Sequence, residues 1–128
     1  MKNFKITFLN HASFSIELDD SITLVDPWYF GRIFNNSWSL LKDCKLIITD
    51  SGGLQEEGSF FNKKIIVCRR TTERPEGIKT GHLYMCEEPQ KLIELFGKLE
   101  NNSYICKPCP YGDGRAAEKI KKILDEEL

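Results

Sequence analysis

Residues 46–57 read LIITDSGGLQEE, and this stretch decides the fold. A continuous apolar run ends at Thr49, the chain turns through a pair of glycines, and a helix is expected to begin there. A second continuous apolar run, Ile65 to Cys68, follows after a segment long enough for one helix. Short apolar runs of this kind indicate strands covered on both faces, and two of them joined by a helix form a right-handed βαβ unit. Residues 46–68 therefore predict a parallel sheet.

The N-terminal third has a different pattern. Apolar and polar residues alternate from residue 13 to residue 18, residues 19–21 are typical of a turn, and residues 22–25 return as a second strand. This alternation predicts an antiparallel hairpin, and residues 5–9 predict one further strand before it.

The C-terminal part predicts one short strand and two helices. Residues 82–85 are expected to form the strand, with His82 half exposed, and apolar residues recur at helical spacing in residues 92–99 and 116–124. The predicted fold class is α/β, with an N-terminal antiparallel hairpin joined to a partial Rossmann-like βαβ parallel sheet with C-terminal helices.

Composition excludes two classes of partner. The 128 residues include 18 basic and 19 acidic side chains, so the net charge of −1 provides no overall field that would recruit nucleic acid or an anionic membrane. No apolar run approaches the ~20 residues of a membrane span. A cytoplasmic protein is expected, and any anion site must be local.

Cysteine and histidine usage does not favour a metal site. Five cysteines form no disulfide framework and are expected to be free thiols. The pair Cys106 and Cys109 has the spacing of a zinc half-site, but no second such pair exists, and His11 and His82 are far apart. We expect no metal ligands and no cofactor.

The glycine turn has the chemistry of a phosphate site. A helix N-terminus presents free backbone N–H groups and a partial positive charge, so Gly52 and Gly53 would let phosphate oxygens approach the backbone, while Ser51 adds a hydroxyl. The alternative is that Ser51 only caps the helix and the glycines only make the turn.

Two charged residues extend this hypothesis. Glu57 lies in the first turns of the same helix, where its carboxylate could accept both hydroxyl groups of a ribose. Arg74 precedes Pro75 in a predicted loop, where its guanidinium could neutralise a diphosphate. Taken singly, each would be an ordinary surface residue.

The turn is followed, in order, by RRTTERPE at residues 69–76 and PYGDGRA at residues 110–116. Together these motifs resemble the C-terminal, UDP-binding part of the non-hydrolysing UDP-N-acetylglucosamine 2-epimerases, and the resemblance covers residues 42–128. It implies that UDP or a UDP-N-acetylhexosamine is bound. By the same resemblance, the diphosphate lies against Ser51, Gly52 and Gly53, the ribose is bound by Glu57, and Arg74 lines the nucleotide site. The turn at residues 111–114 is expected to be structural, with Asp113 and Gly114 setting the start of the last helix.

Residues 1–41 look like the first strands of a metallo-β-lactamase-fold hydrolase. The motifs are residues 5–17, 24–28 and 34–41. The His-x-His-x-Asp-His metal cluster of those enzymes is absent, so His11 is expected to be a strand residue rather than a ligand. The predicted domains are residues 1–41 and 42–128, and the sequence leaves open whether they share one core.

The predicted function is a UDP-binding or UDP-sugar-binding fragment related to an isomerase but not catalytic alone. In the family, proton removal at C2 needs acid/base carboxylates from an N-terminal domain that this sequence does not represent, so no catalytic residue is predicted. Two alternatives stay open. The chain could supply half of a composite epimerase site to a partner or form a homodimer, or it could be a vestigial fusion protein without a ligand.

Overall fold

The structure is a computed structural model that describes residues 4–10, 13–26, 41–100 and 107–127. The predicted features at His11, at Cys106 and within residues 27–40 lie outside these ranges.

Six strands form one sheet in which each strand pairs with the next one along the chain. The strands are β1 (Phe4–Asn10), β2 (Ser13–Leu18), β3 (Ser21–Val25), β4 (Leu46–Thr49), β5 (Lys64–Val67) and β6 (Leu83–Met85). The first three pair antiparallel, and β3 to β6 pair parallel. The predicted hairpin, the predicted βαβ unit and the α/β fold class are confirmed.

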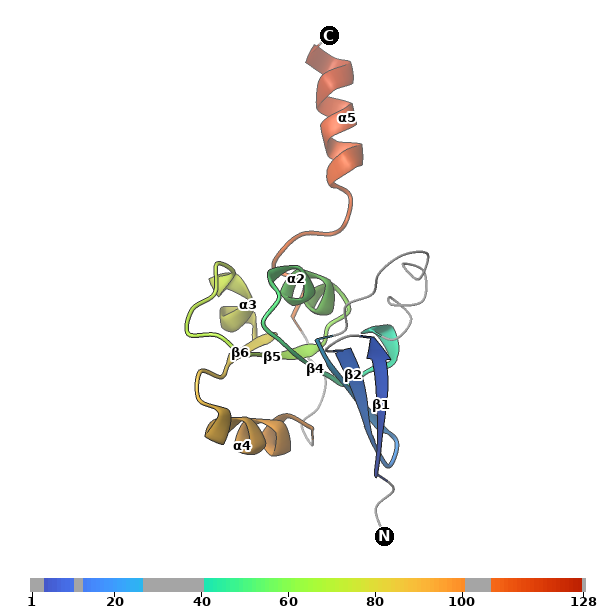
Figure 1. The fold of residues 1–128 in the computed structure, drawn as a ribbon. Helices are drawn as coiled ribbons and strands as arrows, with labels where there is room; N and C mark the ends of the chain where they lie inside the picture. Colours follow the sequence, from blue (N-terminus) through green and yellow to red (C-terminus); the bar gives the residue numbers. More distant parts are fainter. Residues whose placement is uncertain (1–3, 11–12, 27–40, 101–106, 128) are drawn as a thin grey trace.

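Three helices cover the two faces of the parallel part of the sheet: α2 (Gly52–Phe60), α3 (Pro75–Thr80) and α4 (Pro89–Glu100). A further helix, α5 (Ala116–Glu127), follows at the C-terminal end. In Figure 1, α2 and α3 lie on one side of the sheet and α4 on the other, while α5 stands away from the sheet. The two predicted C-terminal helices are confirmed. Within the described ranges, no helix combines the length and the apolar character needed to cross a bilayer.

The core consists of two layers, one on each side of the parallel strands. Every residue of β4 and β5 is buried, as continuous apolar runs predict for strands covered on both faces. The layer beneath α2 and α3 contains Leu24, Leu41, Cys44, Ile47, Leu54, Ile65, Val67 and Leu83. The layer beneath α4 contains Leu46, Ile48, Ile66, Cys86 and Leu99.

The hairpin and the βαβ unit share one sheet and one core. Strand β3 pairs directly with β4, in a register that places Thr23 beside Leu46. Leu24 is fully buried in the same layer as Ile47. The structure thereby answers the question that the sequence left open, while the assignment of residues 1–41 to a separate domain stays a prediction.

The expectation of a half-exposed His82 in a strand is wrong. The His82 side chain is fully buried in the turn between α3 and β6. Gly81, with a φ of 82°, ends α3 and turns the chain inward, a conformation that glycine adopts at low cost. His82 Nδ1 lies 2.7 Å from the Thr80 hydroxyl, and burial together with the charge of Lys107 lowers the pKa of the imidazole.

The position of α2 depends on the absence of a side chain at Gly58. A Cβ at this position would lie 2.7 Å from Ile47 Cδ1 and 2.8 Å from Ile65 Cδ1. Because these contacts are too short for real Cβ atoms, a side chain at Gly58 would push α2 away from β4 and β5.

We expect Gly58→Val to lower the free energy of unfolding by roughly 1–3 kcal/mol through overpacking. Gly97→Val is the matched control, because a Cβ at Gly97 in α4 would meet nothing within 4 Å. The control should change the free energy of unfolding by less than about 0.5 kcal/mol. Urea unfolding monitored by circular dichroism measures both, and equal effects would contradict the close approach at Gly58.

Candidate functional site

The candidate site lies where β4 ends and α2 begins. In open sheets with parallel strands, ligands bind beside the carboxyl ends of the strands. The Thr49 side chain holds this turn, because its hydroxyl accepts a hydrogen bond from the Ser51 N–H at 3.0 Å and donates one to Asp26 Oδ1 at 2.8 Å. The Thr49 hydroxyl, itself held by Asp26, thereby fixes the backbone at Ser51 between β4 and α2.

Ser51 is the N-cap residue of α2, but its side chain makes no capping hydrogen bond. Its φ of −74° and ψ of 130° are the extended values expected at this position. The half-buried hydroxyl is thus not used to satisfy the N–H groups of the first turn. This observation weighs against the alternative in which Ser51 only caps the helix.

The two glycines differ in their surroundings. A Cβ at Gly52 would lie 2.6 Å from Arg74 Nη1 and 2.8 Å from Glu73 Oε1, so side chains of the following loop lie directly against it. A Cβ at Gly53 would have its nearest neighbour, Ser51 Oγ, at 3.9 Å. A side chain at position 52 would thus displace the ends of the Arg74 and Glu73 side chains, whereas one at position 53 would meet nothing closer than van der Waals contact within the described residues.

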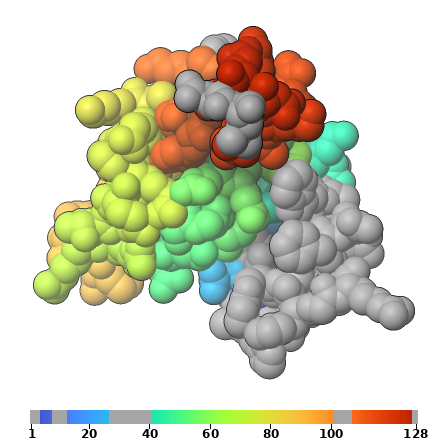
Figure 2. Space-filling view, turned by 90° about the horizontal axis from the view of Figure 1, so that it is seen from above, coloured from blue at the N-terminus to red at the C-terminus, as the bar shows by residue number. Residues whose placement is uncertain are grey.

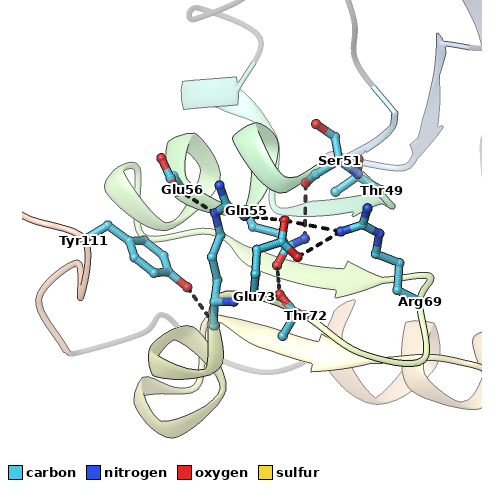
Figure 3. Close-up of polar contacts among 9 residues, drawn as sticks. Thr49, Ser51, Gln55, Glu56, Arg69, Thr72, Glu73 and Tyr111 are labelled. Carbon is cyan, nitrogen blue, oxygen red and sulfur yellow. Dashed lines mark hydrogen bonds and ion pairs between the residues drawn. The ribbon is translucent and has the colours of Figure 1, made fainter.

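Arg74 is ion-paired over the first turn of α2. Its Nε lies 2.6 Å from Glu56 Oε1, and its Nη1 lies 2.6 Å from Glu73 Oε1. The side chain is only 22% exposed, in contrast to an ordinary solvated loop arginine. The Tyr111 hydroxyl donates to the Arg74 carbonyl at 3.1 Å and ties the C-terminal segment to the same loop (Figure 3).

A partly buried chain of hydrogen bonds links the glycine turn to the arginine loop (Figure 3). The fully buried Gln55 donates from Nε2 to the Ser51 carbonyl at 3.3 Å. The Thr72 hydroxyl donates to Gln55 Oε1 at 2.6 Å and accepts from the Arg74 N–H at 3.1 Å. Sequence reasoning missed Gln55 and Thr72. The only available signal was a glutamine on the core side of a short helix, and its partner lies 17 residues away.

Glu57 borders an open pocket of about 220 Å³, which Phe60, Phe61, Tyr111 and Gly112 also line. Burial, followed by the neighbouring charge of Glu56, raises the pKa of the Glu57 carboxyl. Glu57 is four residues after Gly53, and side chains at that spacing share one helix face. A ligand that begins at Gly53 therefore meets Glu57 one turn further along α2.

The structure places the five predicted site residues along the N-terminal two turns of α2 and in the loop beside its first residue. Ser51, Gly52 and Gly53 form the turn, Arg74 lies against Gly52, and Glu57 follows on the Gly53 face. Figure 2 shows the green surface of α2 beside the yellow-green surface of the segment that contains Arg74, with the orange to red C-terminal segment adjoining them. The roles of these residues toward a ligand stay predictions.

The described residues contain no cluster of three or more histidine, cysteine or acidic side chains suited to a metal ion. The free thiols of that part of the chain are Cys44, Cys68, Cys86 and Cys109. Burial raises the pKa of the Cys44 thiol to about 12, so this thiol stays protonated at neutral pH.

Comparison with known proteins gives one consistent family. The family model described as UDP-N-acetylglucosamine 2-epimerase matches residues 12–125. The Campylobacter jejuni UDP-N-acetylglucosamine 2-epimerase is 45% identical over 112 residues, which cover 81% of this chain and 28% of that protein. The Escherichia coli K12 enzyme is 34% identical over 113 residues, with the same two coverages, 81% and 28%. The chain thus spans little more than a quarter of these curated relatives.

Solved structures agree with the sequence comparison. The Methanocaldococcus jannaschii UDP-GlcNAc 2-epimerase in complex with UDP-GlcNAc and UDP superimposes with a TM-score of 0.63 at 32% identity, over 73% of this chain and 26% of that one. The S. aureus MnaA–UDP co-structure gives a TM-score of 0.62 at 37% identity, over 69% of this chain and 26% of that one.

The hydrogen bond from the Thr72 hydroxyl to Gln55 can be tested by its effect on stability. Thr72→Val removes the hydroxyl and leaves the buried Gln55 Oε1 without its donor, which should cost about 1–3 kcal/mol of unfolding free energy. Thr72→Ser retains the hydroxyl and should recover most of that loss. Thr71→Val changes an exposed neighbour and should stay within about 0.5 kcal/mol of the wild type. If Thr72→Val unfolds at the same urea concentration as Thr71→Val, the link contributes nothing.

Proposed function

The chain belongs to the UDP-N-acetylglucosamine 2-epimerase family, and from this premise we propose that it binds UDP or a UDP-N-acetylhexosamine at the start of α2. The observation that carries the proposal is the open space beside Gly53, where a Cβ would meet nothing closer than 3.9 Å. Glycine is a poor helix former, costing about 1 kcal/mol relative to alanine in a helix interior, and at Gly53, in the first turn, no packing within the described residues requires it. A phosphate group against the backbone N–H groups does.

The ligand lies along α2 with its diphosphate at the N-terminus. Ser51, Gly52 and Gly53 hold the diphosphate, with the Ser51 hydroxyl and the first N–H groups of α2 as donors. Arg74 neutralises the phosphate charge from its position against Gly52. Glu57 accepts the ribose hydroxyls, since it follows Gly53 by four residues and the two positions are about 5–6 Å apart on one helix face. The M. jannaschii and S. aureus structures with UDP support the choice of nucleotide.

This arrangement supplies one of the two requirements of epimerisation. Departure of UDP from the sugar leaves negative charge on the diphosphate, which the helix start and Arg74 would stabilise. Removal of the proton at C2 needs positioned acid/base groups, and we assign that role to no residue of this chain. We therefore propose that the chain binds nucleotide without turning over the sugar alone.

A composite site is the second candidate, because the acid/base role at C2 is assigned to no residue described above. In this reading, a partner that carries the acid/base carboxylates completes the site, and mixing the two should generate N-acetylmannosamine product. The resemblance of residues 1–41 to metallo-β-lactamase-fold hydrolases, the homodimer and the cytoplasmic location stay predictions from the sequence.

Calorimetric titration with UDP tests the proposal directly. We expect the wild-type chain to bind UDP and Gly53→Val to weaken binding by at least about ten-fold, because the new side chain fills the space assigned to a phosphate. The same variant should keep its circular dichroism spectrum, since a Cβ at Gly53 has no close neighbour within the described chain. Undiminished binding by a folded Gly53→Val would remove the turn from the site.

The orientation of the nucleotide has its own test. Arg74→Ala should weaken the binding free energy of UDP by on the order of 1.5–3 kcal/mol. It should leave the affinity for uridine nearly unchanged, because uridine carries no phosphate. Glu57→Ala should weaken both ligands about equally, because both carry the ribose. Competition against a fluorescent UDP analogue measures both ligands.

Arg70→Ala is the control for the loss of one positive charge, since Arg70 is 84% exposed and pairs with Glu87. It should leave both ligands unaffected. The assigned orientation is wrong if Arg74→Ala spares UDP while Glu57→Ala damages UDP more than uridine.

A further inference from the structure

A carboxylate lies between two guanidinium groups at the start of α2. Glu73 Oε1 accepts a hydrogen bond from Arg74 Nη1 at 2.6 Å, and Glu73 Oε2 accepts one from Arg69 Nη1 at 3.1 Å (Figure 3). The same Oε1 would be 2.8 Å from a Cβ on Gly52. An anion thus already lies against the glycine turn, held by two arginines.

The surroundings of this carboxylate are those of a phosphate site. Guanidinium groups bind the two oxygens of a carboxylate and the oxygens of a phosphate with the same hydrogen-bond geometry. The start of a helix, next to a glycine, favours an anion of either kind. A hydrogen bond from its own backbone N–H, and after it the charges of Arg69 and Arg74, lower the pKa of the Glu73 carboxyl, so the group is ionised at neutral pH.

We propose that Glu73 occupies the place of a phosphate group in the unliganded chain. A nucleoside diphosphate displaces the carboxylate, and Arg69 then joins Arg74 as a phosphate ligand. The inference rests on the proposed function and adds to it a residue that competes with the ligand and a second arginine that binds it.

Displacement is physically easy at this position. The Glu73 and Arg69 side chains are 58% and 41% exposed, and ion pairs this exposed contribute little to stability. Glu73 lies in the loop before α3, so its side chain can turn outward without uncovering the core. Arg74 keeps its orientation meanwhile, because Glu56 still binds its Nε at 2.6 Å.

Titration of the 128-residue chain with UDP, uridine and inorganic pyrophosphate tests the inference. Glu73→Gln keeps the shape of the side chain and removes the competing charge, so it should tighten UDP and pyrophosphate by roughly five-fold, the scale of one exposed ion pair. Uridine should be unaffected. Glu76→Gln removes one negative charge from the first turn of α3, where Glu76 is exposed, and should leave all three affinities unchanged.

The Arg69→Gln variant tests whether Arg69 binds the phosphate groups or only supports the fold. It should weaken UDP and pyrophosphate several-fold and leave uridine as in the wild type, because only the phosphate groups reach the guanidinium. A loss of uridine affinity of equal size would assign Arg69 to the fold and overturn its role as a phosphate ligand.

The outcomes distinguish this inference from the function on which it rests. If the wild type binds UDP but Glu73→Gln binds it no more tightly than Glu76→Gln does, the displacement is overturned and the UDP site stands. If neither the wild type nor Glu73→Gln binds UDP or pyrophosphate, both fail. Binding that appears only in Glu73→Gln would support both and show that the carboxylate closes the site.

Discussion

The contact between α2 and the sheet at Gly58 is the constraint on which the candidate site depends. With hydrogen in place of a side chain at Gly58, α2 leaves room for the Ile47 and Ile65 side chains, which a Cβ there would meet at 2.7 and 2.8 Å. This contact buries Leu54 and Gln55 and fixes where the first turn of α2 projects beyond β4. The glycine turn, the ribose position and the arginine loop are all placed relative to that turn. A small shift of α2 would therefore displace every proposed ligand contact together.

The fold was predictable because its strongest signals are local. The continuous runs in β4 and β5 and the alternation in β2 follow directly from how many faces of each strand are covered. The exposure of His82 was not predictable in this way, since it depends on a turn at Gly81 and on Thr80 and Asn62 around the ring. Local sequence predicts that a segment forms a strand, but it does not predict which neighbouring loop covers the end of that strand.

The same division holds for the candidate site. Sequence motifs indicated Ser51 and Arg74, but not that two carboxylates would bind the guanidinium. The Glu56 pair joins the middle of α2 to the loop before α3. The spacing of residues along the sequence does not predict a contact between two different elements. The near-zero net charge predicted that any anion site would be local, and the structure adds that the positive charge of Arg74 is already largely compensated. Under the proposed displacement, selectivity for a diphosphate would rest on exchanging one anion for another and not on a net positive charge at the site.

The pairing of β3 with β4 also bears on the order in which the chain assembles. The β2–β3 hairpin closes across a two-residue turn at Asp19 and Asp20, a local event that takes microseconds in isolated hairpins. Pairing Thr23 with Leu46 requires a far longer loop to close, and the entropy of that closure is lost before any contact compensates for it. The seam between the antiparallel and parallel halves is thus expected to close after the β2–β3 hairpin, as are the other parallel pairings. Until it closes, the edge of β4 that pairs with β3 is left open, and unpaired strand edges are where chains generally misassemble.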